Sequence, residues 1–519
     1  MALGTSGIDI YLTGGAKLDA SGCSGTGIVS NSTASCNSST DAGSISVNPS
    51  ASIVTSSVES AGCVYVDTNG GAKIVNASGS NPTYSTGSAT DPYQALANAG
   101  FPKWPSQPSQ PSLSNTVATS TFSLGYVKSY STAYAGCSPD YAAKCWLNPY
   151  EFTGNLSPNV VSLELYDGID AANYDSTYVF TGSFKTGNGT LTFDSTSSIP
   201  ATYYFQGATT TKRGTTTTTG YGLELSSPTI TWGTGGVYYF NGGWAVDGSS
   251  PTMKVGTSTM LSTKYSGASN GATYLQEGNI TFGGGTYYFD GGLVIGGSGN
   301  VTFGPGIYYI VNGPFSVTNG GTLTANGATF VLEGTSYYAF NGGTNLTLSA
   351  PVPNSATAPT NCVLPFSSGS TTGTPYPQTT YTIDNTTVTA TPTYGTPITT
   401  NVGYGYPGKP YPWDGTNGKG ICGVLIYQAP TDSSTDYITE GTTNTVNGII
   451  YTPAAAVTMS GAGSMKAGTN SDGTAGTLAV IANSISLTGS ANLTLSTGSS
   501  TSNYGLSSST TTSQILLTN

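Results

Sequence analysis

Two adjacent tyrosines recur along this chain, each time followed by a large apolar residue and then by an Asx or Gly turn. The clear copies are Tyr238-Tyr239-Phe240-Asn241-Gly242, Tyr287-Tyr288-Phe289-Asp290-Gly291 and Tyr308-Tyr309-Ile310-Val311-Asn312-Gly313, with looser copies at Tyr203 and Tyr337. The segment that precedes them, Asn279-Ile280-Thr281-Phe282-Gly283, recurs as Asn300-Val301-Thr302-Phe303-Gly304, 21 residues later (279 to 300). A repeat of this length, made of β-branched and aromatic residues punctuated by Gly and Asn, predicts the coils of a β-solenoid.

Composition narrows the fold class. Only 7% of the 519 residues are charged, yet 35 Tyr and 15 Phe are far too many aromatic residues for a disordered chain. No window carries apolar residues at helical spacing, and the abundant Gly, Thr and Asn are poor helix formers. We therefore predict an all-β protein, a right-handed parallel β-helix (β-solenoid) with long loop insertions.

Changes in composition divide the chain into six stretches. We expect N-terminal β-helical coils over residues 1–100, a Pro-rich strap or linker over 101–119, an irregular β region with an insertion over 120–220, regular coils over 221–350, a Pro/Thr/Tyr-rich insertion over 351–420, and C-terminal coils with a Ser/Thr-rich tail over 421–519.

The charge balance excludes several kinds of partner. A net charge of −11 with one arginine, Arg213, and no basic cluster argues against binding to nucleic acid or to anionic lipid. No run of 18 apolar residues exists, so we expect no membrane span. The start of the sequence lacks the basic and apolar regions of a signal peptide, so an exported form would need a targeting segment outside this sequence.

The chain contains no histidine and few other ionisable groups. A fold held by main-chain ladders and aromatic stacking has few ion pairs to lose, so its stability should be nearly indifferent to acid. Our hypothesis is that the protein works outside the cell in an acidic setting. The alternative is that Ser/Thr-rich solenoids carry few charges whatever their environment.

The seven cysteines are Cys23, Cys36, Cys63, Cys137, Cys145, Cys362 and Cys422. Without a CxxC motif or histidine a structural zinc site is not expected, and disulfides in an oxidising compartment are the better interpretation. Cys137 and Cys145 could close a small loop, and Cys362 and Cys422 could staple the base of the insertion between them. The other three leave one cysteine unpaired, with a partner outside this sequence, and buried free thiols are the alternative for all seven.

Several segments resemble the C-terminal region of TadG-like proteins, which are associated with Flp/Tad pilus systems. They are Phe303 to Ile310 (FGPGIYYI), Thr322 to Leu332 (TLTANGATFVL), Gly423 to Pro430 (GVLIYQAP) and Val446 to Ala454 (VNGIIYTPA). The N-terminal membrane helix of that family is absent here, and the insertions at 120–220 and 351–420 are long. The resemblance implies a β-helical, pilus-associated surface protein, with no catalytic residue and no cofactor to carry over.

One acidic cluster could support an enzymatic function: Glu164, Asp167, Asp170 and Asp175. These carboxylates could supply a general acid and base about 5 to 9 Å apart, as in glycosidases, or oxygen ligands for calcium, although EF-hand spacing is missing. A solvated loop is the simpler interpretation. Histidine and an Asp-x-Asp pair are absent, and Arg213 falls in a Thr-rich loop, Thr209 to Thr219. We therefore expect no catalytic residue and no enzymatic activity.

Aromatic residues offer a binding function instead. Tyrosines at equivalent positions of successive coils should stack at about 4.8 Å spacing. In the insertion, Tyr404, Tyr406, Tyr411 and Trp413 could contact glycans, a neighbouring subunit or only the loop itself. The expected function is that of a non-enzymatic, extracellular structural protein of the cell surface, either pilus-associated or assembling head to tail into a filament. A glycan-binding adhesin and a polysaccharide-acting enzyme are the alternatives.

Overall fold

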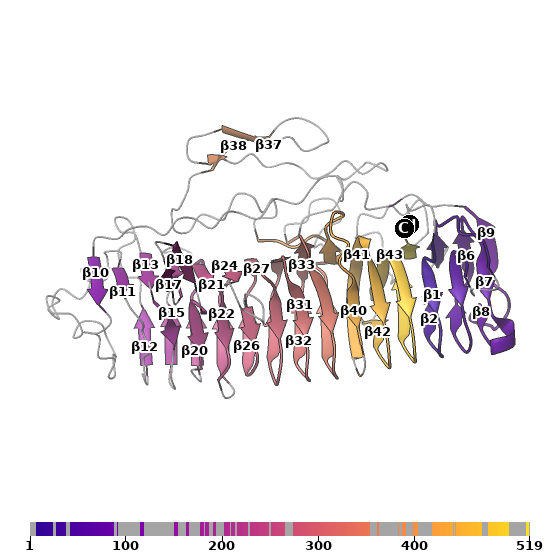
Figure 1. Cartoon of the computed structure of the whole chain (residues 1–519), viewed down its shortest axis with the longest axis horizontal. Helices are drawn as coiled ribbons and strands as arrows, with labels where there is room; N and C mark the ends of the chain where they lie inside the picture. Colours follow the sequence, from indigo (N-terminus) through magenta and orange to yellow (C-terminus); the bar gives the residue numbers. More distant parts are fainter. Residues whose placement is uncertain are drawn as a thin grey trace.

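The computed structural model shows an all-β chain drawn out along one long axis (Figure 1). It describes residues 7–23, 27–37, 42–87, 91, 115–118, 150–153, 162–165, 177–180, 182–185, 190–193, 202–207, 209–212, 215–218, 220–226, 229–248, 251–264, 273–352, 361–362, 382–383, 387–390, 398–402, 418–439, 441, 443–469, 476–497 and 515–517. Helical structure in these residues is confined to the 3-10 turn Thr68–Gly70 (η1). The all-β expectation is confirmed.

Forty strands form one hydrogen-bonded sheet in which a strand pairs in parallel with the strand about three positions further along the chain. Three consecutive strands therefore make one layer, here called a rung, and the rungs stack along the long axis. Equivalent strands of successive rungs form three parallel columns, named A, B and C, which the chain visits in the order A, B, C.

Column A holds both tyrosines of the repeated motif in the copies at Tyr203, Tyr238, Tyr287 and Tyr308, whereas the looser copy at Tyr337 lies in column B. Its strands, in the order in which they stack, are β10 (Asn115–Ala118), β11 (Tyr150–Thr153), β13 (Thr177–Phe180), β16 (Thr202–Phe205), β21 (Val237–Gly242), β24 (Ser258–Lys264), β27 (Gly285–Asp290), β30 (Gly306–Val311), β33 (Ala328–Glu333), β39 (Val424–Gln428), β41 (Thr443–Met459), β43 (Thr477–Leu487), β45 (Ile515–Leu517), β3 (Ile28–Ser30), β6 (Ser57–Ser60) and β9 (Thr83–Thr86).

Columns B and C complete each rung. Column B contains β14 (Phe184–Lys185), β19 (Leu223–Leu225), β22 (Trp244–Val246), β25 (Thr273–Leu275), β28 (Leu293–Ile295), β31 (Pro314–Val317), β34 (Tyr337–Phe340), β40 (Asp436–Ile438), the last parts of β41 and β43, then β1 (Ile10–Leu12), β4 (Ile45–Val47) and β7 (Val64–Val66). Column C contains β12 (Ser162–Leu165), β15 (Thr190–Phe193), β20 (Thr229–Trp232), β23 (Thr252–Val255), β26 (Asn279–Phe282), β29 (Asn300–Phe303), β32 (Thr322–Asn326), β35 (Asn345–Ser349), the first part of β41, then β42 (Ser464–Ala467), β44 (Asn492–Thr497), β2 (Lys17–Gly22), β5 (Ser52–Val54) and β8 (Lys73–Val75).

Two small sheets lie outside the columns. β17 (Thr209–Lys212) and β18 (Thr215–Thr218) form an antiparallel hairpin, so the Thr-rich stretch expected to be a loop is largely strand. The consecutive β-branched threonines of both segments favour strand structure. β36 (Thr382–Ile383), β37 (Thr387–Ala390) and β38 (Ile398–Val402) form a three-stranded sheet within the 351–420 insertion.

The repeated motif accounts for the core. β30 is buried along its whole length, because Tyr308 packs in the core inside the rungs and Tyr309 belongs to a second apolar cluster on the opposite face of the sheet. The rings of Tyr287 and Tyr308 stack with centroids 4.9 Å apart, and those of Tyr288 and Tyr309 at 4.6 Å. The expected stacking of equivalent tyrosines is confirmed.

The asparagines that lead the repeat also form a ladder. Asn300 Nδ2 donates to Asn279 Oδ1 at 3.1 Å, and Thr322 Oγ1 donates to Asn300 Oδ1 at 2.7 Å. These residues open successive strands of column C, so their side chains hydrogen-bond along the long axis on the outer face of the stack. The asparagines thus have a structural role at the head of each strand.

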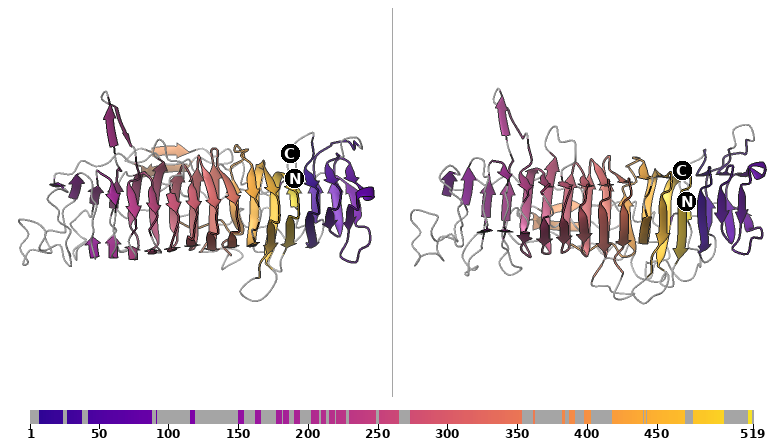
Figure 2. Two further views of the ribbon diagram at one scale, coloured as in Figure 1. Left: turned by 60° about the horizontal axis from the view of Figure 1, so that its bottom comes forward. Right: turned by 90° about the horizontal axis from the view of Figure 1, so that it is seen from below.

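The order of the rungs differs from the order of the sequence. The strands of residues 7–87 do not lie beside β10, which follows them in the chain; they stack on the last strands, β43 to β45 (Figure 2). In Figure 2 the indigo strands accordingly continue the stack beyond the yellow ones. We call residues 7–87 the N-terminal cassette, and its contact with β43 to β45 the junction.

Candidate functional site: the junction of the first and last strands

The junction continues the parallel ladder without a change of pattern. β1 pairs with β43 (Ile10 opposite Ile485), β2 with β44 (Leu18 opposite Leu493), and β3 with β45. Main-chain hydrogen bonds cross it: the amide of Ile485 donates to the Asp9 carbonyl at 2.7 Å, and the amide of Thr13 donates to the Leu487 carbonyl at 3.0 Å. Segments more than 400 positions apart in the sequence are therefore paired by the same main-chain hydrogen bonds that connect successive rungs elsewhere in the stack.

Apolar side chains continue the core across the junction. Leu12 lies opposite Leu487 and Leu18 opposite Leu493, and none of these four side chains is more than 1% exposed. Full burial of each contributes about 1.5–3 kcal/mol. Separation of the cassette would expose both layers, so the edge of β43 to β45 requires a covering rung.

A tight turn brings the two backbones close between columns B and C. Gly14 and Gly489 both have positive φ, +71° and +69°. A Cβ on Gly14 would lie 3.2 Å from the amide nitrogen of Gly489, and one on Gly489 would lie 3.1 Å from the carbonyl oxygen of Gly461. The positive φ favours glycine at both turns, and a side chain there would also force the neighbouring backbone to shift by a few tenths of an ångström.

Asp9 is a carboxyl group buried at the junction. Its Oδ2 accepts hydrogen bonds from Ser30 Oγ at 2.7 Å and from the Ser32 amide at 3.0 Å, while Oδ1 is buried with no hydrogen-bond partner. Desolvation outweighs these bonds and raises the pKa of Asp9 to about 6. The protonated form therefore suits this position, because a neutral carboxyl costs less to bury than a charged one.

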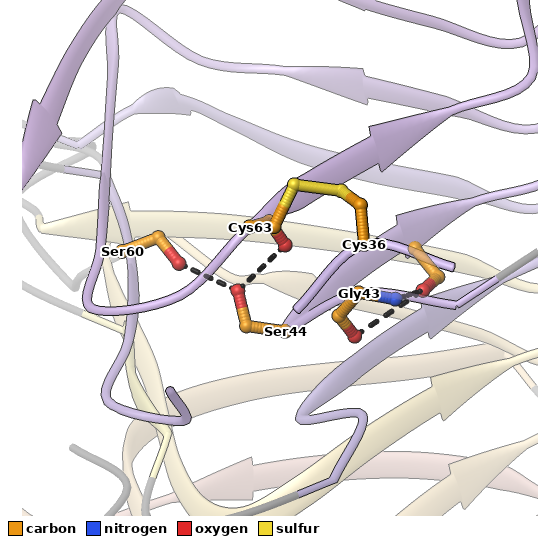
Figure 3. Close-up of a disulfide and its surroundings, with 6 residues drawn as sticks. Cys36, Gly43, Ser44, Ser60 and Cys63 are labelled. Atoms are coloured by element: carbon orange, nitrogen blue, oxygen red, sulfur yellow. Dashed lines mark hydrogen bonds between the residues drawn. A yellow bond between two sulfur atoms is a disulfide. The ribbon is translucent and has the colours of Figure 1, made fainter. Parts of the chain in front are cut away.

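A disulfide fastens the cassette internally. Cys36 and Cys63 are bonded, which ties the segment after β3 to the start of β7 (Figure 3). Beside them Ser44 Oγ donates to the Cys63 carbonyl at 2.9 Å and lies 2.6 Å from Ser60 Oγ. Cys23 is a free, half-buried thiol against the core, and its burial raises its pKa to about 12, so it is not a thiolate at neutral pH.

A second disulfide closes the base of the 351–420 insertion. It joins Cys362 to Cys422, the pairing suggested by their positions on either side of that stretch. Together the two disulfides indicate an oxidising environment, since such bonds persist outside the reducing cytosol.

Buried polar groups hold the loop between β39 and β40. Asp432 accepts from the amides of Ser336 and Ser434 at 2.8 and 3.0 Å, and Gln428 Nε2 donates to the carbonyls of the same two residues at 3.0 and 2.9 Å. Asp436 accepts from the Tyr338 amide at 3.0 Å, and burial raises its pKa well above the ordinary value. These carboxyl groups are inaccessible to a substrate, so they organise the fold.

Most of the residues considered from the sequence as catalytic, binding, metal or disulfide candidates fall outside the described part of the chain. Glu164 lies in β12, opposite Thr192 of β15. Asp167, Asp170, Asp175, Arg213, Tyr404, Tyr406, Tyr411, Trp413, Cys137 and Cys145 lie outside the described residues. For these residues the sequence-based predictions remain predictions.

Among the described residues, no group of three or more His, Cys, Asp or Glu side chains is placed to hold a metal ion. None of the helical structure in that part of the chain is long and apolar enough to cross a membrane.

Sequence reasoning missed Asp9 and Asp436. Each is a carboxylate next to or within a run of strand-forming residues, as in Ile8-Asp9-Ile10 and Asp436-Tyr437-Ile438. The same pattern is also compatible with a solvent-exposed carboxylate. Whether the carboxylate is buried or exposed depends on the neighbouring rung, which the sequence does not identify. Comparison of the chain with protein-family models, curated proteins and solved structures gives no match.

Proposed function

We propose that this protein is a right-handed parallel β-helix that serves as a non-enzymatic structural element of the cell surface, within a filament. The observation that carries the proposal is the uninterrupted parallel ladder of column A, from β10 through the junction to β9. A stack of rungs is an elongated scaffold with one open edge at each end, and open edges pair with further strands unless they are capped. Right-handedness is the rule for crossovers between parallel strands.

Three observations support the setting. The two disulfides indicate an oxidising compartment. The buried Asp9 and the protein's lack of histidine suit an acidic medium, because burial favours the protonated carboxyl. The resemblance of several segments to TadG-like proteins is the basis for proposing that the protein is associated with a pilus.

Negative-stain electron microscopy of the purified chain at pH 4 and pH 7 tests the proposal. We expect uniform fibres whose width is that of one rung. Isolated rods at every concentration and at both pH values would exclude self-assembly, and the accessory protein of a pilus would then be the remaining form of the proposal.

A further inference from the structure

The winding of the chain does not break at the junction. β45 stands in column A and the next strand across the junction, β1, stands in column B, which is the order that the chain follows from β13 to β45 and from β1 to β9. From β10 to β45 the rungs advance in one direction along the axis, and from β1 to β9 they advance further in the same direction. The chain is thus wound as if the cassette belonged after β45.

The chain must cover a long distance to achieve this order. Fifteen parallel pairings separate β10 from β9 in column A. At about 4.8 Å each, they span about 70 Å. Residues 88–114 join the cassette to β10, and 27 residues extend to at most about 95 Å. The closed chain is therefore feasible, but it uses most of this reach.

The same connection has the length of a single rung. Thr83 of β9 and Asn115 of β10 are 32 positions apart. Neighbouring strands of column A begin 21 positions apart between Gly285 and Gly306, and 35 positions apart between Asn115 and Tyr150. By sequence spacing, β10 would therefore follow directly on β9.

We propose that the N-terminal cassette of one copy docks on β43 to β45 of another copy, in the register seen within the chain, and so links copies into a continuous fibre. The partner is a second copy of this chain, and the inference rests on the proposed structural function. In the fibre β9 is followed directly by β10 of its own chain, and residues 88–114 have to join neighbouring rungs instead of strands about 70 Å apart. The buried Asp91 accepts a hydrogen bond from Tyr451 Oη at 2.8 Å in the closed chain, and in the fibre it would make this bond to Tyr451 of the second copy.

The exchange conserves every contact of the junction, so it costs little free energy. Ile10 opposite Ile485 and Leu18 opposite Leu493 are the same pairs whether one chain or two supply them. Closed monomer and fibre then differ mainly in the entropy of association and in the edges they leave open, so concentration decides between them. The fibre also covers the edge of β9, where Tyr84 is 52% exposed.

A disulfide trap distinguishes the two arrangements. Tyr11 and Ser486 are partly exposed partners in adjacent parallel strands, a separation that a disulfide can bridge. In a chain carrying Cys23→Ser, Tyr11→Cys with Ser486→Cys is assembled, oxidised and run on a denaturing gel without reductant. We expect a ladder of covalent multimers. Thr281→Cys with Thr302→Cys, which pairs two rungs of one chain in either arrangement, should give monomers only.

The outcomes separate this inference from the proposed function. Fibres whose junction disulfide stays within single chains would overturn the exchange and leave the filament function standing. Absence of fibres, with closed monomers only, would overturn both. Covalent multimers in fibres support both.

A shortened connection provides an independent test. Deletion of residues 104–113 reduces the reach between the cassette and β10 to about 60 Å, less than closure requires. The variant should lose the closed monomer and sediment as dimers and fibres at concentrations where the unaltered protein is monomeric. A closed monomer of unchanged stability would contradict the inference.

Discussion

At the scale of single residues, the buried carboxyl group of Asp9 and the half-buried one of Glu333 determine how the protein responds to pH. The pKa of Asp9 is raised from 3.8 to about 6 and that of Glu333 from 4.5 to about 7, both chiefly by desolvation. Protonated carboxyls fit the folded state, so their contribution is fully present below about pH 4 and is lost as pH rises through 6 and 7. We expect the free energy of unfolding to fall from pH 4 to pH 7, with about 3 kcal/mol from Asp9. Urea titrations across this range measure it, and a stability that rises with pH would contradict it.

Two substitutions isolate the contribution of Asp9. Asp9→Asn removes the titrating group, so the variant should lose that part of the pH dependence. Ser30→Ala removes a hydrogen bond that favours the ionised carboxylate, so it should steepen the loss between pH 4 and pH 7. Identical slopes in the two variants would assign the pH dependence to other groups.

The stacked tyrosines set the stability of the central rungs. Tyr308 is fully buried, stacks on Tyr287 with centroids 4.9 Å apart, and donates from its hydroxyl to the Gly304 carbonyl at 2.8 Å. Tyr308→Ala should cost about 3–5 kcal/mol, by analogy with other large aromatic truncations. Tyr308→Phe keeps the ring and should cost about 1–2 kcal/mol.

Tyr84→Ala is the matched control for these variants, because its ring is 52% exposed. Denaturant unfolding should place it within about 0.5 kcal/mol of the parent. A loss as large as that of Tyr308→Ala would show that the end rung is covered in solution.

The tyrosine columns were predicted from the sequence and the junction was not, although the sequence carries a sign of both. A repeated Tyr-Tyr pair fixes register locally, since equivalent residues 21 positions apart, such as Tyr287 and Tyr308, must align. The strands at the junction also share a pattern, Ile-x-Leu-Thr-Gly-x-Ala-x-Leu, which begins at Ile10 in the cassette and at Ile485 in the last rungs. Such a pattern gives the register of two strands but not their adjacency, because any open edge with the same alternation can accept the same rung.

At the scale of elements, the cassette depends on its disulfide. Cys36 and Cys63 are 27 positions apart, and a loop of that length is stabilised by about 3–4 kcal/mol through the restriction of the unfolded chain. Cys36→Ser with Cys63→Ser should lower the stability of the cassette by this amount. Amide exchange in β3 to β7 should accelerate, while exchange in β26 to β33 should change little. Equal acceleration in both regions would mean that the cassette and the central rungs unfold as one unit.

At the scale of the whole molecule, the sequence order and the spatial order are related by a circular permutation. A chain that begins at Asn115, runs to Asn519 and continues through residues 1–87 would follow the columns from β10 to β9 without a return. Its new connection, from β45 to β1, is comparable in length with residues 31–44, which connect β3 to β4. Residues 88–114 are then unnecessary, because no segment has to run back along the stack.

This permutant separates exchange of the cassette from simple contact between rod ends. It should fold to the same strand content, by circular dichroism, because every pairing of the three columns is retained. It should also stay monomeric in the ultracentrifuge at concentrations where the natural order forms fibres. In the permutant the cassette follows β45 directly in the sequence, so releasing it would break the strand pairing between consecutive rungs of one chain. If fibres grew equally well, the open edges of β9 and β10 would be sufficient for assembly, and cassette exchange would not be needed to explain the filament.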